Sequence, residues 1–156
     1  MSDAAAVHAP RIVVGVDGSE PSKAALRWAV RQAELTGDAI VPVIAWEFPR
    51  NWTGWSPPGE LPFDWEDAAR KILTETIDGA IGSDHPVEVR TRVVQGHPAG
   101  VLLDEAKGAA LLVVGNRGHG GFSEALLGSV GQHLTHHATC PILIVRSPNP
   151  AEADTR

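Results

Sequence analysis

Runs of continuous apolar residues alternate along this chain with segments in which apolar residues recur every three or four positions. A short continuous apolar run is typical of a strand in a parallel sheet that is covered on both faces. Such runs predict buried strands over residues 11–17, 39–46, 111–115 and 141–146. A fifth strand is predicted over 87–93, where valine and threonine alternate with charged residues, so one of its faces meets water.

The segments between these runs have the apolar spacing of amphipathic helices. In the first segment, apolar residues follow an i, i+3, i+4, i+7 pattern from Leu26 to Ala33. This helix is expected to begin near Pro21, with Asp17 or Ser19 as its cap. Further helices are predicted over residues 69–80, 98–107 and 129–138.

Strands and helices therefore alternate along the whole chain. With right-handed crossovers, this order predicts a doubly wound, Rossmann-like α/β fold, in which a five-stranded parallel sheet of order 3-2-1-4-5 has helices on both faces. Ligands bind such sheets at the carboxyl ends of the strands where the winding direction reverses. That rule selects the ends of the first and fourth strands, residues 15–19 and 115–121, and both segments contain glycine.

Two features depart from this regular pattern. Pro42 lies inside the second predicted strand, although proline suits a strand end, a bulge or an edge because it lacks a ladder donor. Residues 47–62 are rich in proline and include Trp52 and Trp55, so they predict a long loop rather than a regular element. Three interpretations of the tryptophans around 46–65 stay open: a self-packed loop, closure over a ligand, or contact with a protein partner.

Composition narrows the class of protein. The 156 residues carry a net charge of −6, which argues against a nucleic-acid partner. A single cysteine fits a reducing compartment, no apolar run is long enough to span a membrane, and residues 1–10 lack the pattern of a secretory signal. We expect a cytoplasmic protein with one domain over 10–147 and disordered ends at 1–9 and 148–156.

The segment 115–130, GNRGHGGFSEALLGSV, carries the candidate chemistry. Its glycines allow the backbone to approach a ligand closely, and Gly128 and Ser129 open a predicted helix whose first amides form an anion site. Two groups of donors at one switch point favour a polyphosphate over a single carboxylate. The chain contains no GxxxxGK[ST] sequence, and its first strand-to-helix turn is GVDGSE rather than GxGxxG, so neither a P-loop nor a dinucleotide site is expected.

The spacing Gly115-x2-Gly118-x9-Gly128-Ser129 resembles the G-2x-G-9x-G-[S/T] signature of the ATP-binding branch of the universal stress protein family. The resemblance covers nearly the whole chain. Residues 12–30 are similar to the family's first strand and helix, 95–106 to its middle segment and 140–146 to its closing strand. It implies the adenine-nucleotide alpha hydrolase-like form of the Rossmann architecture, with ATP and Mg²⁺ as ligands.

The resemblance also implies roles for single residues. Asp17 is similar to the acidic residue near the phosphates that helps to hold the cation, and Ala45 to the residue whose backbone meets the adenine edge. Gly115 and Gly118 match positions at the ribose and phosphates, and Ser129 begins a second phosphate clamp. The expected nucleotide-binding residues are Gly15, Val16, Asp17, Ala45, Gly115, Asn116, Arg117, Gly118, Gly120, Gly121, Gly128, Ser129 and Val130.

Some residues have alternative interpretations. Asn116 and Gly131 stand where the family often has serine; Asn116 keeps hydrogen-bonding capacity, whereas Gly131 removes a hydroxyl group. Asp17 can also be a turn or cap aspartate without a ligand. His133 and His137 have a spacing that can hold a metal, but without an identifiable third ligand they are expected to be surface or interface residues, as is His136. Cys140 is expected to belong to the core.

Three functions compete. The first is a regulatory protein that holds ATP with Mg²⁺ and signals stress or growth status. The second is a slow ATPase or phosphotransferase, which the sequence does not favour because no base for an attacking water is identifiable. The third is a nucleotide-free interaction module, against which the intact motif over 115–129 counts. The closing strand 140–146 is short, apolar and at a sheet edge; since the family commonly dimerises through it, the resemblance implies a homodimer paired along this strand.

Overall fold

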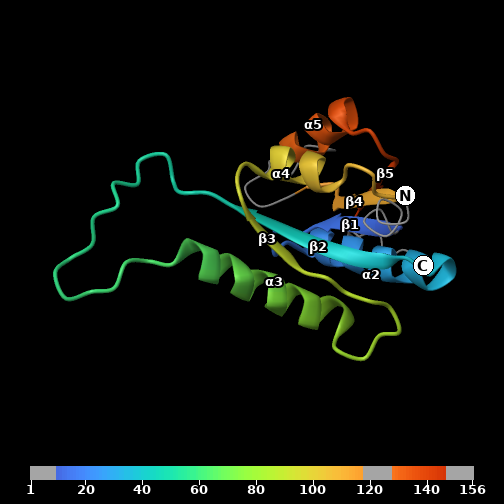
Figure 1. Cartoon of the computed structure of the whole chain (residues 1–156), viewed down its shortest axis with the longest axis horizontal. Helices are drawn as coiled ribbons and strands as arrows, with labels where there is room; N and C mark the ends of the chain where they lie inside the picture. Colours follow the sequence, from blue (N-terminus) through green and yellow to red (C-terminus); the bar gives the residue numbers. More distant parts are fainter. Residues whose placement is uncertain (1–9, 118–127, 147–156) are drawn as a thin grey trace, which may run out of the picture.

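Five parallel strands form one sheet in the order β3-β2-β1-β4-β5, which confirms the doubly wound architecture (Figure 1). The computed structural model describes residues 10–117 and 128–146. The strands are β1 (Arg11–Gly15), β2 (Ala39–Trp46), β3 (Arg92–Gln95), β4 (Leu111–Gly115) and β5 (Ile142–Val145). The disordered ends expected at 1–9 and 148–156 lie outside the described residues.

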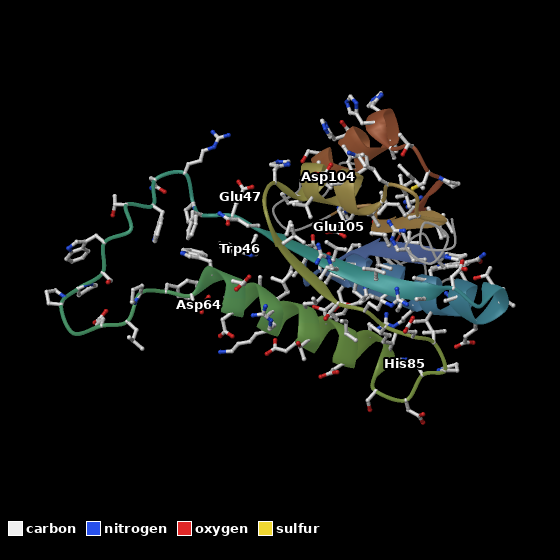
Figure 2. The ribbon with its side chains drawn as sticks, viewed as in Figure 1. Trp46, Glu47, Asp64, His85, Asp104 and Glu105 are labelled. Atoms are coloured by element: carbon white, nitrogen blue, oxygen red, sulfur yellow. The ribbon has the colours of Figure 1, made fainter. Side chains whose placement is uncertain are left out.

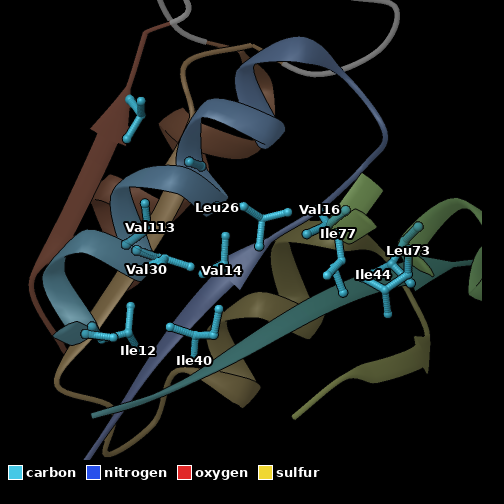
Figure 3. Packing of buried hydrophobic residues seen from close by; sticks show 14 of the residues in the cluster. Ile12, Val14, Val16, Leu26, Val30, Ile40, Ile44, Leu73, Ile77 and Val113 are labelled. Carbon is cyan, nitrogen blue, oxygen red and sulfur yellow. The ribbon is translucent and has the colours of Figure 1, made fainter. Parts of the chain in front are cut away.

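Two helices cover each face of this sheet. On one face lie α2 (Glu20–Thr36) and α3 (Trp65–Ile81), and on the other lie α4 (Pro98–Glu105) and α5 (Ser129–His137). Alternate residues of β1 enter the two cores: Ile12 and Val14 pack toward α2 and α3 (Figure 3), whereas Val13 packs with α4 and α5. The continuous apolar runs in the sequence follow from this arrangement, because both faces of each central strand are buried.

The turn from β1 into α2 is fixed by hydrogen bonds within the sequence itself. Ser19 is the N-cap, and its Oγ accepts a hydrogen bond from the Ser22 N–H at 3.4 Å. Asp17 supports this cap, because its Oδ1 accepts from the Ser19 N–H at 2.9 Å. The helix ends at Gly37, whose φ of 82° is readily adopted by glycine. Of the two expected caps, Ser19 therefore caps α2 and Asp17 orients Ser19.

The strand predicted over 87–93 is wrong in its position, because β3 covers only Arg92–Gln95. Upstream of β3 there is an isolated bridge between Ile40 and Val89. The cause is Pro42, which lies in register with Val14 inside β2 rather than at an edge. Ile40 donates its N–H to the Glu88 carbonyl and accepts from the Arg90 N–H. Two residues later, Pro42 is the next residue of β2 directed at this segment, but it has no N–H to donate. The parallel ladder is therefore interrupted between Val89 and Arg92.

Residues 47–64, hereafter the arm, connect β2 to α3 and contain no helix or strand, as predicted for 47–62. The arm projects away from the sheet (Figure 1), and Trp46 and Asp64 mark its two attachment points (Figure 2). Asp64 caps α3 by accepting from the Asp67 N–H at 2.9 Å, so the helix begins before its first buried apolar residue, Ala69. In the described part of the chain, no helix has the length and apolar character needed to cross a membrane.

Candidate functional site

A pocket of about 350 Å³ opens at the carboxyl ends of β1 and β4, where the winding of the sheet reverses. This volume lies at the lower end of the range of about 300–1,000 Å³ that is usual for small-molecule sites. The strand ends, the start of α4 and the first turn of α5 contribute its walls. The lining residues are Gly15, Val16, Asp17, Ser22, Val43, Ala45, Pro98, Leu102, Val114, Gly115, Asn116, Arg117, Gly128, Ser129, Val130 and Gly131.

The two strands that end at the pocket both finish in glycine for a packing reason. A Cβ on Gly115 would lie 2.5 Å from the Pro21 Cβ and 2.7 Å from the Pro21 carbonyl carbon. A Cβ on Gly15 would lie 2.9 Å from a Leu102 methyl carbon. Gly115 therefore allows the first turn of α2 to pack directly on β4, and Gly15 allows α4 to approach β1. Both glycines are needed by the fold as well as exposed to the pocket.

Asp17 brings a carboxylate to the pocket wall immediately after β1. Its Oδ1 accepts hydrogen bonds from both the N–H and the Oγ–H of Ser19. These bonds fix the orientation of the carboxylate and tie it to the start of α2. Asp17 therefore has the turn role that the sequence left open, and the same carboxylate residue also lines the pocket.

Another part of the pocket is formed where the end of β4 is bonded to the start of α5. The Asn116 N–H donates to the Val145 carbonyl at 2.9 Å, and the Gly128 N–H donates to the Asn116 carbonyl at 2.7 Å. Residues 116 and 128 are thus held together, although eleven residues separate them in the sequence. Asn116 is buried in this junction, with 8% of its surface exposed. The two ends of the glycine-rich segment consequently meet at the pocket.

The N-cap of α5 is a glycine, so within the described part of the chain the first turn of this helix has no side-chain cap from its own N-cap residue. Gly128 is the N-cap and makes no side-chain cap bond. By contrast, Ser19, Asp64 and His97 each cap their helices through the side chain. The first three amides of a helix have no partner within the helix, and they carry the positive end of its dipole. The residues that carry these amides, Ser129, Val130 and Gly131, line the pocket, an arrangement that suits an anion.

The structure places ten of the thirteen expected nucleotide-binding residues around this one pocket. The other three, Gly118, Gly120 and Gly121, lie outside the described residues, as does His119. Six further lining residues were not expected to bind a ligand: Ser22, Val43, Pro98, Leu102, Val114 and Gly131.

Four of these six further lining residues are apolar side chains of α4, β2 and β4. Leu102 and Pro98 come from α4, while Val43 and Val114 come from β2 and β4. Together with Ala45 they give the pocket an apolar region beside its polar end, as is usual in sites for organic ligands. The topological rule could have identified them, because α4 starts directly after the carboxyl end of β3 and so lies at the same edge of the sheet.

Other candidate residues lie away from the pocket. The lining includes no residue of the arm and not Trp46, so within the described chain the expected closeness of the tryptophan loop to this site is not observed. Trp46 instead contacts Phe48 at 5.3 Å between ring centroids, and Phe48 stacks on Trp52 at 4.3 Å. Cys140 packs against the core under α4 and α5, and its partial burial raises the pKa of the thiol. His133, His136 and His137 are exposed on α5.

The two edges of the sheet differ in polarity. β5 has the sequence ILIV, and Ile142, Leu143 and Ile144 are only half-buried. At the other edge β3 begins with Arg92 and ends with Gln95, both exposed. The Arg92 guanidinium bonds the Glu105 carboxylate at 2.8 Å, and this hydrogen bond raises the pKa of Arg92. A charged edge resists pairing with another strand, whereas an apolar edge does not.

Comparison with known proteins identifies relatives of this chain. A model of the universal stress protein family matches residues 9–146. A universal stress protein of Mycolicibacterium smegmatis is 37% identical over 154 residues, covering 93% of this chain and 51% of the relative. A second, from Mycobacterium tuberculosis, is 36% identical over 151 residues, covering 90% of this chain and 45% of the relative. The chain spans about half the length of the curated relatives that it matches.

Solved structures with the same architecture include nucleotide complexes. A universal stress protein crystallised with cAMP has a TM-score of 0.65 and 28% identity, covering 90% of this chain and 98% of the other. A universal stress protein of Archaeoglobus fulgidus in complex with dAMP has a TM-score of 0.60 and 21% identity, covering 88% and 97%. At 21% identity, the second similarity concerns the fold alone.

Proposed function

Because this chain belongs to the universal stress protein family, we propose that it is a cytoplasmic regulatory protein that binds ATP with Mg²⁺ in the pocket between β1 and β4 and acts in stress response or growth control. The observation that supports this proposal is that the first turn of α5, whose N-cap is a glycine, lines the same pocket as Asp17. A polyphosphate occupies such a site because backbone amides and the helix dipole supply positive potential. The net charge of −6 is therefore no obstacle to binding an anion.

The apolar wall accounts for the adenine half of the ligand. A base needs a flat, largely apolar slot, and Leu102, Val43 and Ala45 supply apolar surface next to the polar end of the pocket. The ribose would lie between them and Gly115, at the end of β4. The related structure at 28% identity holds cAMP, a ligand with the same base and sugar.

The residues around the pocket fit one Mg²⁺ ion. Mg²⁺ is usually held by one or two carboxylates together with substrate phosphates and waters. Asp17 is the carboxylate in the pocket lining, and its bonds to Ser19 hold it in place. When bound, the ion would share the charge of the phosphates; Asp17 would orient it, and the amides of α5 would bind the phosphate oxygens.

Two alternative functions use the same pocket differently. A slow ATPase or phosphotransferase needs a base near the attacking group. Among the described lining residues, Asp17 is the one carboxylate, and here it is assigned to the cation, so hydrolysis would be slow. A nucleotide-free interaction module would leave the first amides of α5 without a ligand, so this alternative predicts no heat on titration with Mg-ATP.

Gly128→Glu tests the site. Gly128 has φ −69°, which glutamate adopts without strain, so the variant is expected to fold. Its carboxylate would lie where the phosphates bind, and we expect calorimetry to show loss of Mg-ATP binding. Thr135→Glu adds the same charge to an exposed position of α5 and should bind as the wild type does. Equal loss in both variants, or no binding by the wild type, would overturn the proposed site.

We further propose that two copies of the chain pair through residues 140–146. The half-buried apolar strand β5 supports this, because the opposite edge carries Arg92 and Gln95. Ile144→Lys on β5 should give a monomer in sedimentation at concentrations where the wild type is a dimer. Val94→Lys on β3 is the matched control, since both side chains are half-buried against the same core. A monomeric wild type, or a monomeric Val94→Lys variant, would contradict pairing through β5.

The arm is proposed as a contact surface for a protein partner. Trp55 is 73% exposed and Phe63 is 62% exposed, and large aromatic side chains dominate the energetics of protein interfaces. The buried indole N–H groups of Trp46 and Trp65, at the base of the arm, have no hydrogen-bond partner among the described residues. A photo-crosslinking residue at position 55 should yield one discrete adduct in cells that is absent when the residue replaces the exposed Leu35 on α2. No adduct, or the same adduct from both positions, would remove this proposal.

A further inference from the structure

The exposed face of α5 carries a histidine pair that the nucleotide site does not use. His133 and His137 are separated by one helical turn, and their ring centroids are 4.5 Å apart, with an angle of 40° between the ring planes. His136 lies next to His137 in the sequence, but their centroids are 6.4 Å apart. The pocket receives the first turn of α5, whereas the pair belongs to its last two turns.

We propose that His133 and His137 chelate one divalent transition-metal ion of the kind that imidazole favours, such as Zn²⁺, Ni²⁺ or Cu²⁺. Residues at i and i+4 lie one above the other on a helix, so two imidazoles at this spacing reach the same point in space. Ring nitrogens bind Zn²⁺ at about 2.0–2.1 Å, and two rings that already contact each other can reach this distance by rotation of their side chains.

The position of the histidines near the end of α5 also favours a bound cation. His136 and His137 lie in the last turn of α5, where the final carbonyls carry the negative end of the helix dipole. A cation is stabilised at that end, as an anion is stabilised at the first turn. A metal bound to both histidines would also link residue 133 to residue 137 across one turn, and so would oppose fraying of the end of α5.

The site is a two-ligand site on the surface. No cluster of three or more histidine, cysteine, aspartate or glutamate side chains able to hold a metal is present in residues 10–117 and 128–146. In the proposed site, water would fill the coordination positions that the two histidines leave open. A site of this kind binds more weakly than a closed structural zinc site.

The test is calorimetric titration of the untagged full-length protein with ZnCl₂ in a buffer containing excess MgCl₂, since Mg²⁺ prefers oxygen ligands and would occupy any oxygen-only site. The expected result is one equivalent of Zn²⁺ whose affinity falls at least about tenfold, or about 1.4 kcal/mol, in both His133→Asn and His137→Asn. Because both side chains are exposed, neither variant is expected to unfold.

His136→Asn is the matched control and should retain wild-type affinity, because its ring lies outside the close pair. As a second readout, Zn²⁺ should raise the thermal midpoint of the wild type and of His136→Asn but not of the double variant at 133 and 137. The proposal fails if Zn²⁺ does not bind, if the double variant binds as tightly as the wild type, or if His136→Asn loses as much affinity as the other two. Loss of Mg-ATP binding in Gly128→Glu is independent of all these outcomes.

Discussion

The pocket and the arm differ in how closely the rest of the protein packs around their residues. Around the pocket, the sheet and three helices meet so closely that Gly115 has no room for a Cβ beside Pro21. In the arm, Leu61 is 93% exposed and Trp55 is 73% exposed. The pocket is therefore shaped by the fold, whereas the arm is attached to it at Trp46 and Asp64 and is otherwise free of the two cores.

This difference separates the two regions in function as well as in stability. A change at the pocket should act on the core and on the ligand together, because the same residues serve both. A change in the arm should act on neither. Substitutions in the two regions should therefore differ in their effects on stability and on binding.

Leu102→Ala is expected to have the largest effect. Leu102 is 5% exposed, packs in the core beneath α4 and α5, and also lines the pocket. Its truncation should lower the free energy of unfolding by about 2–5 kcal/mol and weaken nucleotide binding. Leu61→Ala makes the same chemical change in the arm, and urea denaturation should place it within about 0.5 kcal/mol of the wild type. Similar losses in the two variants would contradict the division.

Gly115→Ala should be the next most severe change. The added methyl group would overlap the backbone of Pro21, so α2 must move away from β4, at a cost of about 1–3 kcal/mol. Gly79→Ala is the control: a Cβ there meets no atom within 4 Å, and alanine in this helix should stabilise the protein by about 0.5–1 kcal/mol. Denaturant titration of both variants measures the contrast, and a stable Gly115→Ala would show that the contact is readily relieved.

Trp55→Ser is expected to leave both stability and nucleotide binding nearly unchanged. Its side chain is mostly in water and belongs to neither core, so the free energy of unfolding should change by no more than about 0.5 kcal/mol. Calorimetry with Mg-ATP should give the wild-type affinity, because the arm does not line the pocket. A large fall in affinity would mean that the arm closes over the ligand, which was one of the interpretations left open by the sequence.

The smallest effect concerns Cys140, which lies just before β5 and belongs to neither the pocket lining nor the arm. Burial raises the pKa of its thiol, so in the folded protein the reactive thiolate forms at higher pH than in the unfolded chain. Its contribution to stability is complete below the unfolded pKa and is lost as the pH rises through the folded pKa. The rate of alkylation should therefore rise at a higher pH in buffer than in urea, and the stability of Cys140→Ala should fall less at alkaline pH. Coincident alkylation profiles in buffer and urea would contradict this.

The sequence predicted most of the fold because its strongest signals are local. The apolar runs of β1, β2, β4 and β5 and the helix spacing of α2 are visible without any tertiary information. β3 was misplaced because its first residue depends on Pro42, a residue on another strand, which interrupts the ladder before Arg92 without changing the register. A pattern of alternating residues reveals a tendency to extend, but it does not reveal where a partner strand can donate hydrogen bonds.

The pocket shows the same limit. The glycines and Ser129 were predictable because a spaced motif and the switch-point rule both select them. Leu102 and Ser22 were not, because their apolar or capping patterns are those of any packed helix. They gain a second role only because α2 and α4, from opposite faces of the sheet, both reach the pocket at the carboxyl ends of the strands. The position of the arm was likewise hidden, since proximity to Trp46 in sequence suggested the pocket, whereas the chain leads away from it.

Mass spectrometry of the small molecules released from the natively purified protein would show whether the pocket between β1 and β4 holds an adenine nucleotide. We expect the wild type to release an adenine nucleotide in near-stoichiometric amount and Gly128→Glu, purified in the same way, to release none. A wild type that carries no adenine nucleotide and gives no heat with Mg-ATP would contradict this expectation.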